Sequence, residues 1–508
     1  MEAPVQPPIN ANTQAVMVRT LTLDGNRVFG SADLVRISGF NPDTLYTLEE
    51  LRQLAAKVTA HYHRHGYFLA QTVIPAQDIT EGVVRFTVLE GRIGAIRLNN
   101  QSGVADQVAT ALLQGLQGAE ATTKAALERS LLLLNDLPGT RAHSILRPGT
   151  APGTADLQLN LTTGSGTSGS VEADNQGNHY TGTYRLGTAL YVNELLGWGD
   201  VASVRILTSG EGLTYGRASY QALAGSTTVG LAASSLYYRL GGAFANLQST
   251  GTAMTSTLYA SYPLVRARRQ NLSAHWAMDS KDFDDRTGAG TPSQNRKRVQ
   301  NHTAGLKGNR QDERNSSSVQ YALSWTHGTI DLQEATTRSN DAITAQSNGD
   351  FDKLAYSLSW LQESPAKRSL HINLSGQFAS KNLDASEKFS LGGSGGVRAY
   401  PAGEASGDEG VILTLEGRTP WPAMSQYLAG AAQAVAFVDM GSEMPNKNAW
   451  GTGSSTRRSL YGMGFGLNFT SPSKWTASAY CAFKLGDETA TSAPDATWRL
   501  WLQAAKYF

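Results

Sequence analysis

The sequence predicts a membrane β-barrel of about sixteen antiparallel strands, preceded by two small αβ modules. From about residue 165 onward, short segments alternate apolar and polar residues between turn-like interruptions. Before that point, stretches with helical periodicity alternate with strand-like stretches. No run of about 18 apolar residues occurs, which excludes a transmembrane helix. The mean hydropathy of −0.29 still permits a barrel, because its strands need apolar residues only at alternate positions.

Composition narrows the function classes. The 508 residues carry a net charge of +1, so no overall field favours nucleic acid as a partner. The 52 glycines and 19 tyrosines suit a membrane barrel. The single cysteine, Cys481, excludes an intrachain disulfide and a cysteine-based metal site. Because it lies in an expected strand, we interpret it as a packed thiol.

The N-terminal extension, residues 1–14, lacks both the basic and the apolar region of a signal peptide. We interpret the sequence as one from which a signal peptide has been removed, with Met1 as an added start. The expected domain boundaries are 15–91 and 92–163 for the two modules and 164–508 for the barrel.

The first module combines two helices with three strands. Thr47 begins the longer helix, since Thr47 and Glu50 form a capping-box pattern, and Gly66 ends it. The apolar face of this helix consists of Leu51, Leu54, Ala55, Val58 and Tyr62. In order, the expected elements are a strand at 16–23, a short helix within 28–37, the longer helix from 47, and strands at 69–75 and 83–89.

The second module repeats this order. Its expected elements are a strand at 93–98, helices at 104–116 and 122–134, and strands at 141–147 and 155–161. The pattern resembles tandem polypeptide-transport-associated (POTRA) domains, and the string GYFLAQTVIPAQDITEGVVRFTVLEGRIGAIRL, residues 66–98, carries the resemblance. Such modules bind extended peptide as an added strand at an open sheet edge. The plainer alternative is that they are spacers.

The barrel strands are recognised by alternation. In the clearest one, 461–469, Tyr461, Met463 and Phe465 lie on one face and glycines on the other. The C-terminal strand ends on Phe508, which resembles the signal used by the outer-membrane assembly machinery. The expected strands are 168–175, 180–192, 199–209, 213–223, 227–238, 253–263, 269–280, 297–310, 315–328, 351–362, 368–379, 410–418, 429–439, 456–469, 474–484 and 497–508. Long loops are expected at 281–296, 329–350 and 440–455.

The segment 391–410, LGGSGGVRAYPAGEASGDEG, predicts a loop folded into the barrel. A guanidinium buried there needs a carboxylate, because an unpaired buried charge is costly. We therefore expect Arg398 to pair with Asp439 and tether the loop to the wall, with Val397 and Tyr400 beside it. Solvated loop charges are the alternative, and an ordinary aromatic contact is the alternative for Tyr400.

An acidic cluster follows the loop tip, and three histidines lie near the end of the longer helix of the first module. We expect Glu404, Asp408 and Glu409 to be solvated rather than paired with wall arginines. His61 and His65 have a spacing that can hold zinc, but no carboxylate set supports a metal site, so His61, His63 and His65 are interpreted as solvated helix-end residues.

Catalysis and cofactor binding find no support in the sequence. No nucleophile–base–acid set is evident, and the phosphate-binding pattern G-x-x-x-x-G-K-[ST] is absent. The glycine-rich GGSGG has no strand-to-helix context for phosphate and suits a hinge. We expect no enzyme activity, no cofactor and no metal.

Ordered motifs along the chain give a family resemblance. At the barrel start, Asp174, Asn175 and Gly177 precede TGTYR, which ends in Arg185, and NELLGWGD follows at 193–200. Further on come VRAY at 397–400 and FVDMG at 437–441. Together with the tandem modules, they resemble the outer-membrane transporters of two-partner secretion, which export filamentous haemagglutinins, haemolysins and contact-dependent toxins.

The resemblance implies an outer-membrane protein of a Gram-negative cell with its modules in the periplasm. There it would recognise an unfolded partner exoprotein and export it through the pore without ATP. It would be a monomer, surrounded by lipid and lipopolysaccharide and inserted by the barrel-assembly machinery. The alternative is a barrel-assembly insertase of the same superfamily, which shares modules, barrel and loop motif. A passive porin needs no modules, and a surface esterase needs a catalytic set.

Two departures from the family pattern stand out. The family's loop motif usually reads Val-Arg-Gly-Tyr, whereas Ala399 replaces the glycine here, which matters if the position needs a positive φ. Many members also carry an N-terminal helix that plugs the pore, whereas only residues 1–14 precede the first module. Either that helix is absent or this sequence does not include it, so both alternatives stay open for plugging by the N-terminus.

Overall fold

The structure is a computed structural model and describes residues 15–118, 121–289, 293–451 and 456–508. The chain forms two compact units, Met1–Gly164 and Ser165–Phe508. The extension expected over residues 1–14 lies outside the described residues. None of the helices in the described ranges is both long enough and apolar enough to cross a membrane.

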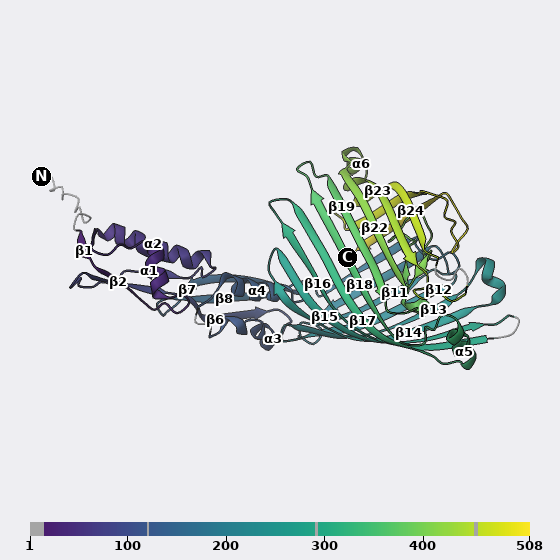
Figure 1. The fold of residues 1–508 in the computed structure, drawn as a ribbon, viewed down its shortest axis with the longest axis horizontal. Helices are drawn as coiled ribbons and strands as arrows, with labels where there is room; N and C mark the ends of the chain where they lie inside the picture. The colour runs from purple at the N-terminus through teal and green to yellow at the C-terminus, as the bar shows by residue number, and fades with distance from the viewer. Residues whose placement is uncertain (1–14, 119–120, 290–292, 452–455) are drawn as a thin grey trace. The chain divides into compact units, whose positions relative to one another are not determined.

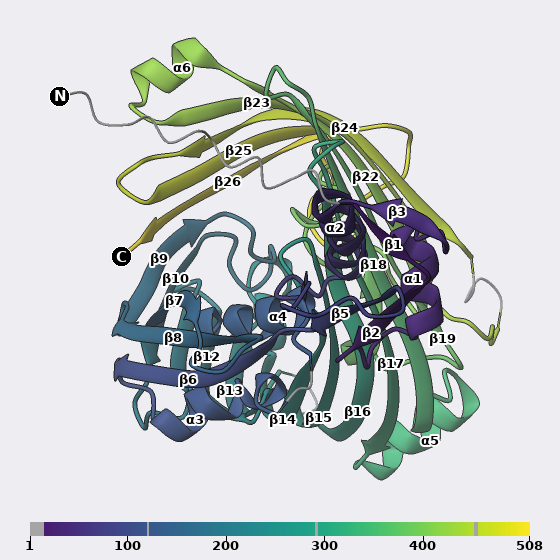
Figure 2. The same ribbon diagram turned by 90° about the vertical axis from the view of Figure 1, so that its left-hand side faces the viewer.

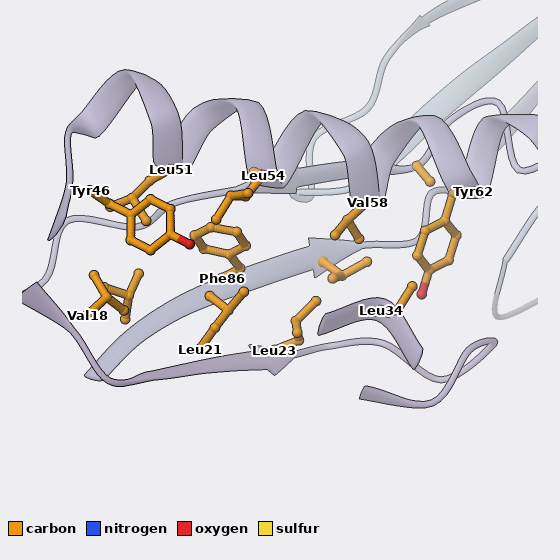
Figure 3. Close-up of a cluster of buried hydrophobic side chains, with 14 residues drawn as sticks. Val18, Leu21, Leu23, Leu34, Tyr46, Leu51, Leu54, Val58, Tyr62 and Phe86 are labelled. Carbon is orange, nitrogen blue, oxygen red and sulfur yellow. The ribbon is translucent and has the colours of Figure 1, made fainter. Parts of the chain in front are cut away.

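The first module is a small sheet with helices packed on it (Figure 3). Strand β2 pairs in parallel with β5, which pairs antiparallel with β4, so β4 forms one edge of the sheet. Two further short strands, β1 and β3, pair with each other. The elements are β1 (Val16–Val18), β2 (Thr20–Asp24), α1 (Ser31–Ser38), β3 (Thr44–Tyr46), α2 (Leu48–Arg64), β4 (Gln71–Val73) and β5 (Val83–Leu89).

Helix α2 begins and packs as its sequence predicts. The Thr47 hydroxyl accepts from the Glu50 backbone N–H, and the Glu50 carboxylate accepts from the Thr47 N–H, which completes the capping box. Its predicted apolar face is buried in the core of the module (Figure 3). At the far end of this core the Tyr62 hydroxyl donates to Glu90 at 2.8 Å. Burial and this hydrogen bond raise the pKa of Tyr62.

Two predicted elements of the modules are wrong in detail. The strand expected at 16–23 is broken at Arg19, because the N–H groups of Arg19 and Thr20 both donate to the Gly82 carbonyl and turn the chain from one sheet to the other. The helix expected at 104–116 is divided into α3 (Asp106–Ala111) and the 3₁₀ helix η1 (Gln114–Leu116). Gly115 in this segment is a poor helix former, which favours the tighter last turn.

The second module repeats the layered design. Strand β6 pairs in parallel with β8, and β8 pairs antiparallel with β7. Along β8, Leu157, Leu159 and Leu161 are fully buried while the residues between them are partly exposed, which is the alternation expected of a one-sided sheet. The remaining elements are β6 (Arg92–Gln101), α4 (Lys124–Asn135), β7 (Thr140–Pro148) and β8 (Thr154–Thr163).

The second unit is a closed antiparallel barrel (Figures 1 and 2). Within the described residues it has sixteen strands, which confirms the predicted fold, and each predicted segment overlaps one of them. They are β9 (Thr167–Asp174), β10 (Arg185–Asn193), β11 (Val201–Thr208), β12 (Leu213–Ala224), β13 (Thr227–Arg239), β14 (Thr250–Arg266), β15 (Gln270–Thr287), β16 (Ser293–Asp312), β17 (Ser317–Leu332), β18 (Gly349–Glu363), β19 (Ser369–Ala379), β22 (Glu409–Pro420), β23 (Ala431–Met444), β24 (Arg458–Thr470), β25 (Trp475–Lys484) and β26 (Trp498–Tyr507).

The two faces of the wall differ in chemistry. On β26, the side chains of Trp498, Leu500 and Leu502 are exposed on the outside. Between them, Trp501 points inward and donates from Nε1 to the Arg398 carbonyl at 2.7 Å. Apolar residues facing outward and polar contacts facing inward are what a barrel in lipid requires.

Several strands run beyond the predicted ends. Strand β15 continues to Thr287 and β16 begins at Ser293, so most of the loop expected at 281–296 is strand, and residues 290–292 lie outside the described residues. Here the outward positions carry charges instead of apolar residues, such as the Asp282–Arg298 pair at 2.6 Å. Beyond the apolar part of the membrane, cross-strand ion pairs stabilise the sheet. Apolar alternation stops there, so it predicts strands that are too short.

The other two predicted loops also contain regular structure. Helix α5 (Ala335–Ile343) lies within the loop expected at 329–350. Strand β23 extends to Met444 into the loop expected at 440–455, of which residues 452–455 lie outside the described residues. Shorter elements of the barrel unit are η2 (Gly242–Leu247), η3 (Ala385–Glu387), β20 (Phe389–Ser390), β21 (Ser406–Gly407) and α6 (Pro422–Tyr427).

Candidate functional site

The segment between β19 and β22 folds back as a hairpin against the inner wall. Strands β20 and β21 pair antiparallel, and residues 391–405 form the tip between them. The glycines allow this tight path. Gly393 adopts a φ of +119°, and a Cβ on Gly396 would lie only 2.0 Å from the Leu391 carbonyl oxygen. The glycine-rich sequence is therefore required by the turn that presents Arg398.

Arg398 is bound by two carboxylates of the wall. Its Nε and Nη2 donate to the two oxygens of Asp439 on β23, both at 2.9 Å, which is the bidentate geometry of a strong pair. Its Nη1 donates to Glu416 on β22 at 2.7 Å, and its backbone N–H also reaches Asp439 at 3.1 Å. The guanidinium carbon lies 3.3 Å from the centroid of the Phe437 ring. We call Arg398, Asp439 and Glu416 the tip anchor.

The tip anchor is almost dry. Arg398 and Glu416 are each 5% exposed and Asp439 is fully buried. The chemistry of Arg398 led to Asp439 from the sequence, but Glu416 was missed. The sequence contained a signal for Glu416, because Ile412, Thr414 and Glu416 alternate along a strand whose other face is apolar, which places Glu416 on the inward face. Removing one member would leave a buried charge unpaired, which costs about 3–5 kcal/mol in comparable pairs.

The neighbours of Arg398 fill a small apolar core under the tip. Val397 and Tyr400 are fully buried there, beside Leu391 and Phe437. The Tyr400 hydroxyl donates to the Glu488 carbonyl at 3.2 Å, and Lys484 lies 4.7 Å above its ring. Tyr400 therefore contacts the loop after β25 as well as the core beneath the tip.

Ala399 fits without backbone strain. It does not adopt a positive φ, so the position has no need of glycine for conformational reasons. Its methyl group instead faces Gly462 on β24, where an added Cβ would lie 2.6 Å from the Ala399 Cβ. The space for the alanine is provided by a glycine on the wall.

The expectation that the acidic cluster is solvated is wrong for two of its members. Glu404 is fully buried and accepts hydrogen bonds from the N–H and hydroxyl groups of Thr491 and Ser492, with Arg458 at 2.9 Å. Burial alone would raise the pKa of Glu404, but these donors outweigh it and hold the pKa below its ordinary value.

Asp408 and Glu409 have partners at the base of the hairpin. Asp408 is fully buried and accepts from the N–H of Leu383, from the N–H of Lys447 and from Lys388 Nζ at 2.8 Å. Glu409 is partly exposed and pairs with Lys447 at 2.6 Å. Leu383, Lys388 and Lys447 lie outside the segments with apolar alternation, so no sequence pattern indicated these partners.

The motif at the barrel start closes the seam between β9 and β26. Only five residue pairs, from Asp174↔Gln503 to Ser170↔Tyr507, join these strands. Beyond these pairs the Asn175 side chain continues the bonding to β26. It donates to the Leu500 carbonyl at 2.8 Å and accepts from the Leu502 N–H at 2.7 Å.

The rest of the motif shapes and positions this turn. Asp174 pairs with Arg185 at 2.8 Å, and a Cβ on Gly177 would lie 2.0 Å from the Gly182 carbonyl oxygen. Gln176, which precedes Gly177 in the same turn, accepts a hydrogen bond from the hydroxyl of Ser394 in the loop tip at 2.8 Å. At the other end of β9, Phe508 exchanges backbone hydrogen bonds with Gly169 and its ring lies over that glycine.

Two of the three histidines near the end of α2 contact backbone carbonyls. His63 Nε2 contacts the Ala70 carbonyl at 2.9 Å and His65 Nδ1 contacts the His61 carbonyl at 2.8 Å. Burial, followed by the charge of His65, lowers the pKa of His61. Across the described ranges, no group of three or more His, Cys, Asp or Glu side chains is placed to hold a metal ion.

Comparison with known proteins identifies the family. A family model described as haemolysin secretion/activation protein ShlB/FhaC/HecB matches residues 153–469, and a model of the ShlB-type POTRA domain matches residues 16–91. The chain belongs to this secretion family. It is therefore an outer-membrane β-barrel transporter of two-partner secretion with a POTRA domain, in a family of transporters that work with partner exoproteins.

Individual relatives agree with this assignment. The chain is 32% identical to the heme/hemopexin transporter protein HuxB of Haemophilus influenzae (strain 86-028NP), over 91% of this chain and 81% of that protein. It is 24% identical to the outer membrane transporter CdiB of Dickeya dadantii (strain 3937), over 93% and 84%. The solved structure of CdiB from Escherichia coli matches 99% of this chain and 93% of that one, with a TM-score of 0.78 at 20% identity, and so shares the fold.

Proposed function

We propose that this transporter captures an unfolded partner exoprotein in the periplasm and passes it through the barrel to the cell surface without ATP. The observation that carries the proposal is an open groove of about 860 Å³ in the POTRA domain, between α2 and the edge strand β4. An extended chain that binds beside an edge strand gains main-chain hydrogen bonds, while the groove receives its side chains.

The groove has the chemistry that an unfolded chain needs. The α2 side contributes Leu48, Ala56 and Thr59, and the other side is formed by residues 71–77. Leu48 is 42% exposed although it is a large apolar residue. The Thr72 N–H donates to the Thr59 hydroxyl at 2.9 Å. A carbonyl of a bound client strand would replace that hydroxyl as the acceptor.

In the barrel, the loop tip is proposed as the element that yields to the client. The tip anchor of Arg398, Asp439 and Glu416 holds it against the wall, and Val397 and Tyr400 support it from below. No nucleotide-binding pattern occurs in the sequence, so folding of the client outside the cell is the proposed driving force.

The relatives suggest the class of client. HuxB is named a heme/hemopexin transporter and resembles this chain more closely than CdiB of Dickeya dadantii does. We therefore favour a client exoprotein that serves heme or hemopexin transport. Its gene is expected beside the gene of this protein.

The remaining proposals concern assembly. Phe508 would serve as the signal for the barrel-assembly machinery, and the mature protein would be a monomer in lipid and lipopolysaccharide after removal of a signal peptide. The second module would extend the client-binding surface, since β7 also forms an open sheet edge.

The groove is tested with two matched substitutions on one helix. Ala56→Arg places a long charged side chain in the groove, whereas Gln53→Arg places the same side chain on an exposed position of α2 outside it. We expect Ala56→Arg to reduce the partner exoprotein in the medium at least tenfold and Gln53→Arg to leave it unchanged, with equal amounts of transporter in the outer membrane. Equal secretion by both variants would overturn capture at this groove. Loss of other barrel proteins from the membrane would favour the insertase alternative.

A further inference from the structure

The inward segment has a second set of contacts at its root, on other strands of the wall than those that hold Arg398. Glu387, at the end of η3, is 3% exposed. One carboxylate oxygen lies 2.6 Å from Lys281 Nζ on β15 and 3.2 Å from Asn301 Nδ2 on β16. The other lies 2.7 Å from Lys353 Nζ on β18. We call Glu387, Lys281 and Lys353 the root anchor.

Neighbouring groups strengthen this attachment. The Glu387 carbonyl accepts from Gln377 at 3.1 Å and from Lys353 at 3.2 Å. Three residues earlier, Asp384 pairs with Lys297 on β16 at 2.8 Å, where both side chains are nearly buried. Two carboxylates of the root thus meet three lysines of the wall, which would lose their partners if the root left.

Apolar packing also fixes the root. Leu383 is 2% exposed and belongs to a buried cluster with inward-facing residues of β16, β17 and β18, among them Val299, Ile330 and Phe351. The tip residues belong to a different cluster, built on β22 to β25. Because the two clusters share no residue, the tip can lose its packing while the packing of the root remains.

The chain between the two anchors can bend. Gly392, Gly393, Gly395 and Gly396 lie between Glu387 and Arg398. The base of the hairpin is held by the Lys388–Asp408 pair at 2.8 Å, on the root side of these glycines. A displacement of the tip therefore requires rotation about glycine bonds and leaves the base in place.

From this arrangement we infer that Glu387 is the positioning residue of a second, independent anchor, and that the loop opens by swinging its tip about a fixed root. The root stays on β15 to β18 while Arg398 leaves Asp439 and Glu416. The opening then forms beside β22 to β26, and the three lysines of the root region stay covered. The inference concerns the loop alone and holds whatever the client is.

The test measures each anchor with its own reporter, without any client. Single cysteines replace Ala405 in the tip core or Leu383 in the root cluster, which are 4% and 2% exposed, in a Cys481→Ser background. Labelling by a water-soluble maleimide is followed in the full-length protein in lipid vesicles. We expect Arg398→Gln to speed labelling at position 405 at least about tenfold, as loss of a buried pair predicts, and at position 383 less than about twofold.

The reverse pattern is expected from the root. Glu387→Gln, and independently Lys353→Met, should speed labelling at position 383 at least about tenfold. Glu334→Gln, which alters an outward-facing pair with Arg296, is the matched control and should change neither rate. Equal acceleration of both reporters by Arg398→Gln would show a single cooperative unit and overturn the inference. The inference would also be overturned if neither root substitution changed labelling at position 383 in protein that keeps its strand content.

Discussion

At the scale of single residues, Arg398 shows how a barrel holds one charge inside its wall. Two carboxylates and an aromatic face surround the guanidinium, so its charge is more than balanced by its direct partners. Arg418 completes the set by pairing with the other oxygen of Glu416 at 2.7 Å. The function of the anchor thus depends on four charged groups, of which the sequence pattern indicated two.

Exchange of the charges tests the pair between Arg398 and Asp439. Arg398→Asp or Asp439→Arg alone should loosen the loop, with a loss of about 3–5 kcal/mol from the unpaired charge. The double exchange should restore only part of it, because the new aspartate would face Glu416. Addition of Glu416→Gln should improve the restoration further. Channel conductance in planar bilayers gives the readout, and absence of any restoration in the triple variant would contradict the pairing.

Glu404 predicts how the loop responds to acid. Its pKa is lowered in the folded state, so its hydrogen bonds contribute their full stability above the ordinary value of 4.5. This contribution is lost as the pH falls through the lowered folded value. Glu404→Gln should therefore lower the melting temperature at neutral pH and have progressively less effect below pH 4.5. Thermal unfolding followed by circular dichroism measures this, and a difference that is constant from neutral to acid pH would contradict it.

At the scale of elements, the strand pair that closes the barrel has the shortest ladder. Strands β25 and β26 share nine residue pairs, whereas β26 and β9 share five. The Asn175 side-chain amide acts like a strand residue, because its NH₂ donates to the Leu500 carbonyl and its oxygen accepts from the Leu502 N–H. Gln176 beside it contacts the loop tip through Ser394, so the seam and the loop share one turn.

Replacement of Asn175 tests its part in closing the barrel. Asn175→Leu keeps the size of the side chain and removes both hydrogen bonds, which leaves two backbone groups of β26 without these partners. We expect a loss of about 1–3 kcal/mol and a lower temperature at which the folded, heat-modifiable band disappears in electrophoresis. Asn178→Leu nearby serves as the control. It removes a 3.4 Å contact to the Ala402 carbonyl and a local hydrogen bond from the Tyr180 N–H, neither of which involves β26, and should have a smaller effect on the seam. Equal shifts for both would show that the seam does not depend on Asn175.

At the scale of the whole molecule, the chain combines a periplasmic unit, which we propose binds the client, with a transmembrane unit. The modules owe their shape to buried apolar cores, whereas the barrel turns much of its apolar surface outward, including exposed Trp325, Phe378 and Phe465. The energetic reason is the solvent, since lipid accepts the apolar face that water would reject. The two units can therefore be altered separately.

Deletion of residues 16–163 tests that separation. We expect the shortened protein to insert and to conduct ions, because the barrel closes on its own residues from β9 to β26. Export of the partner exoprotein should fall below detection, because the client-binding groove is gone. Conductance and secretion are measured side by side, and continued export would show that the modules are dispensable for capture.

The sequence by itself determined the features that depend only on residues close together in the chain, namely the strands and the helix start. Alternation located all sixteen strands, because a strand's facing repeats every two residues, and Thr47 with Glu50 located the start of α2. It failed where strands left the lipid, since charged cross-strand pairs replaced the apolar residues of β15 and β16. It also predicted one continuous strand at 16–23, which the structure breaks at Arg19 because the distant Gly82 carbonyl turns the chain there.

Only the tertiary structure decided which charges meet. Glu387 and Lys281 lie 106 residues apart, and Asn175 and Leu500 lie 325 apart. Their contacts depend on the register of every strand between them and on where the barrel closes, which no local pattern encodes. For the same reason Glu404 and Asp408 were expected in water although the folded chain buries both. The sequence predicts that a buried polar side chain needs a partner, whereas closure of the barrel determines which residue that partner is.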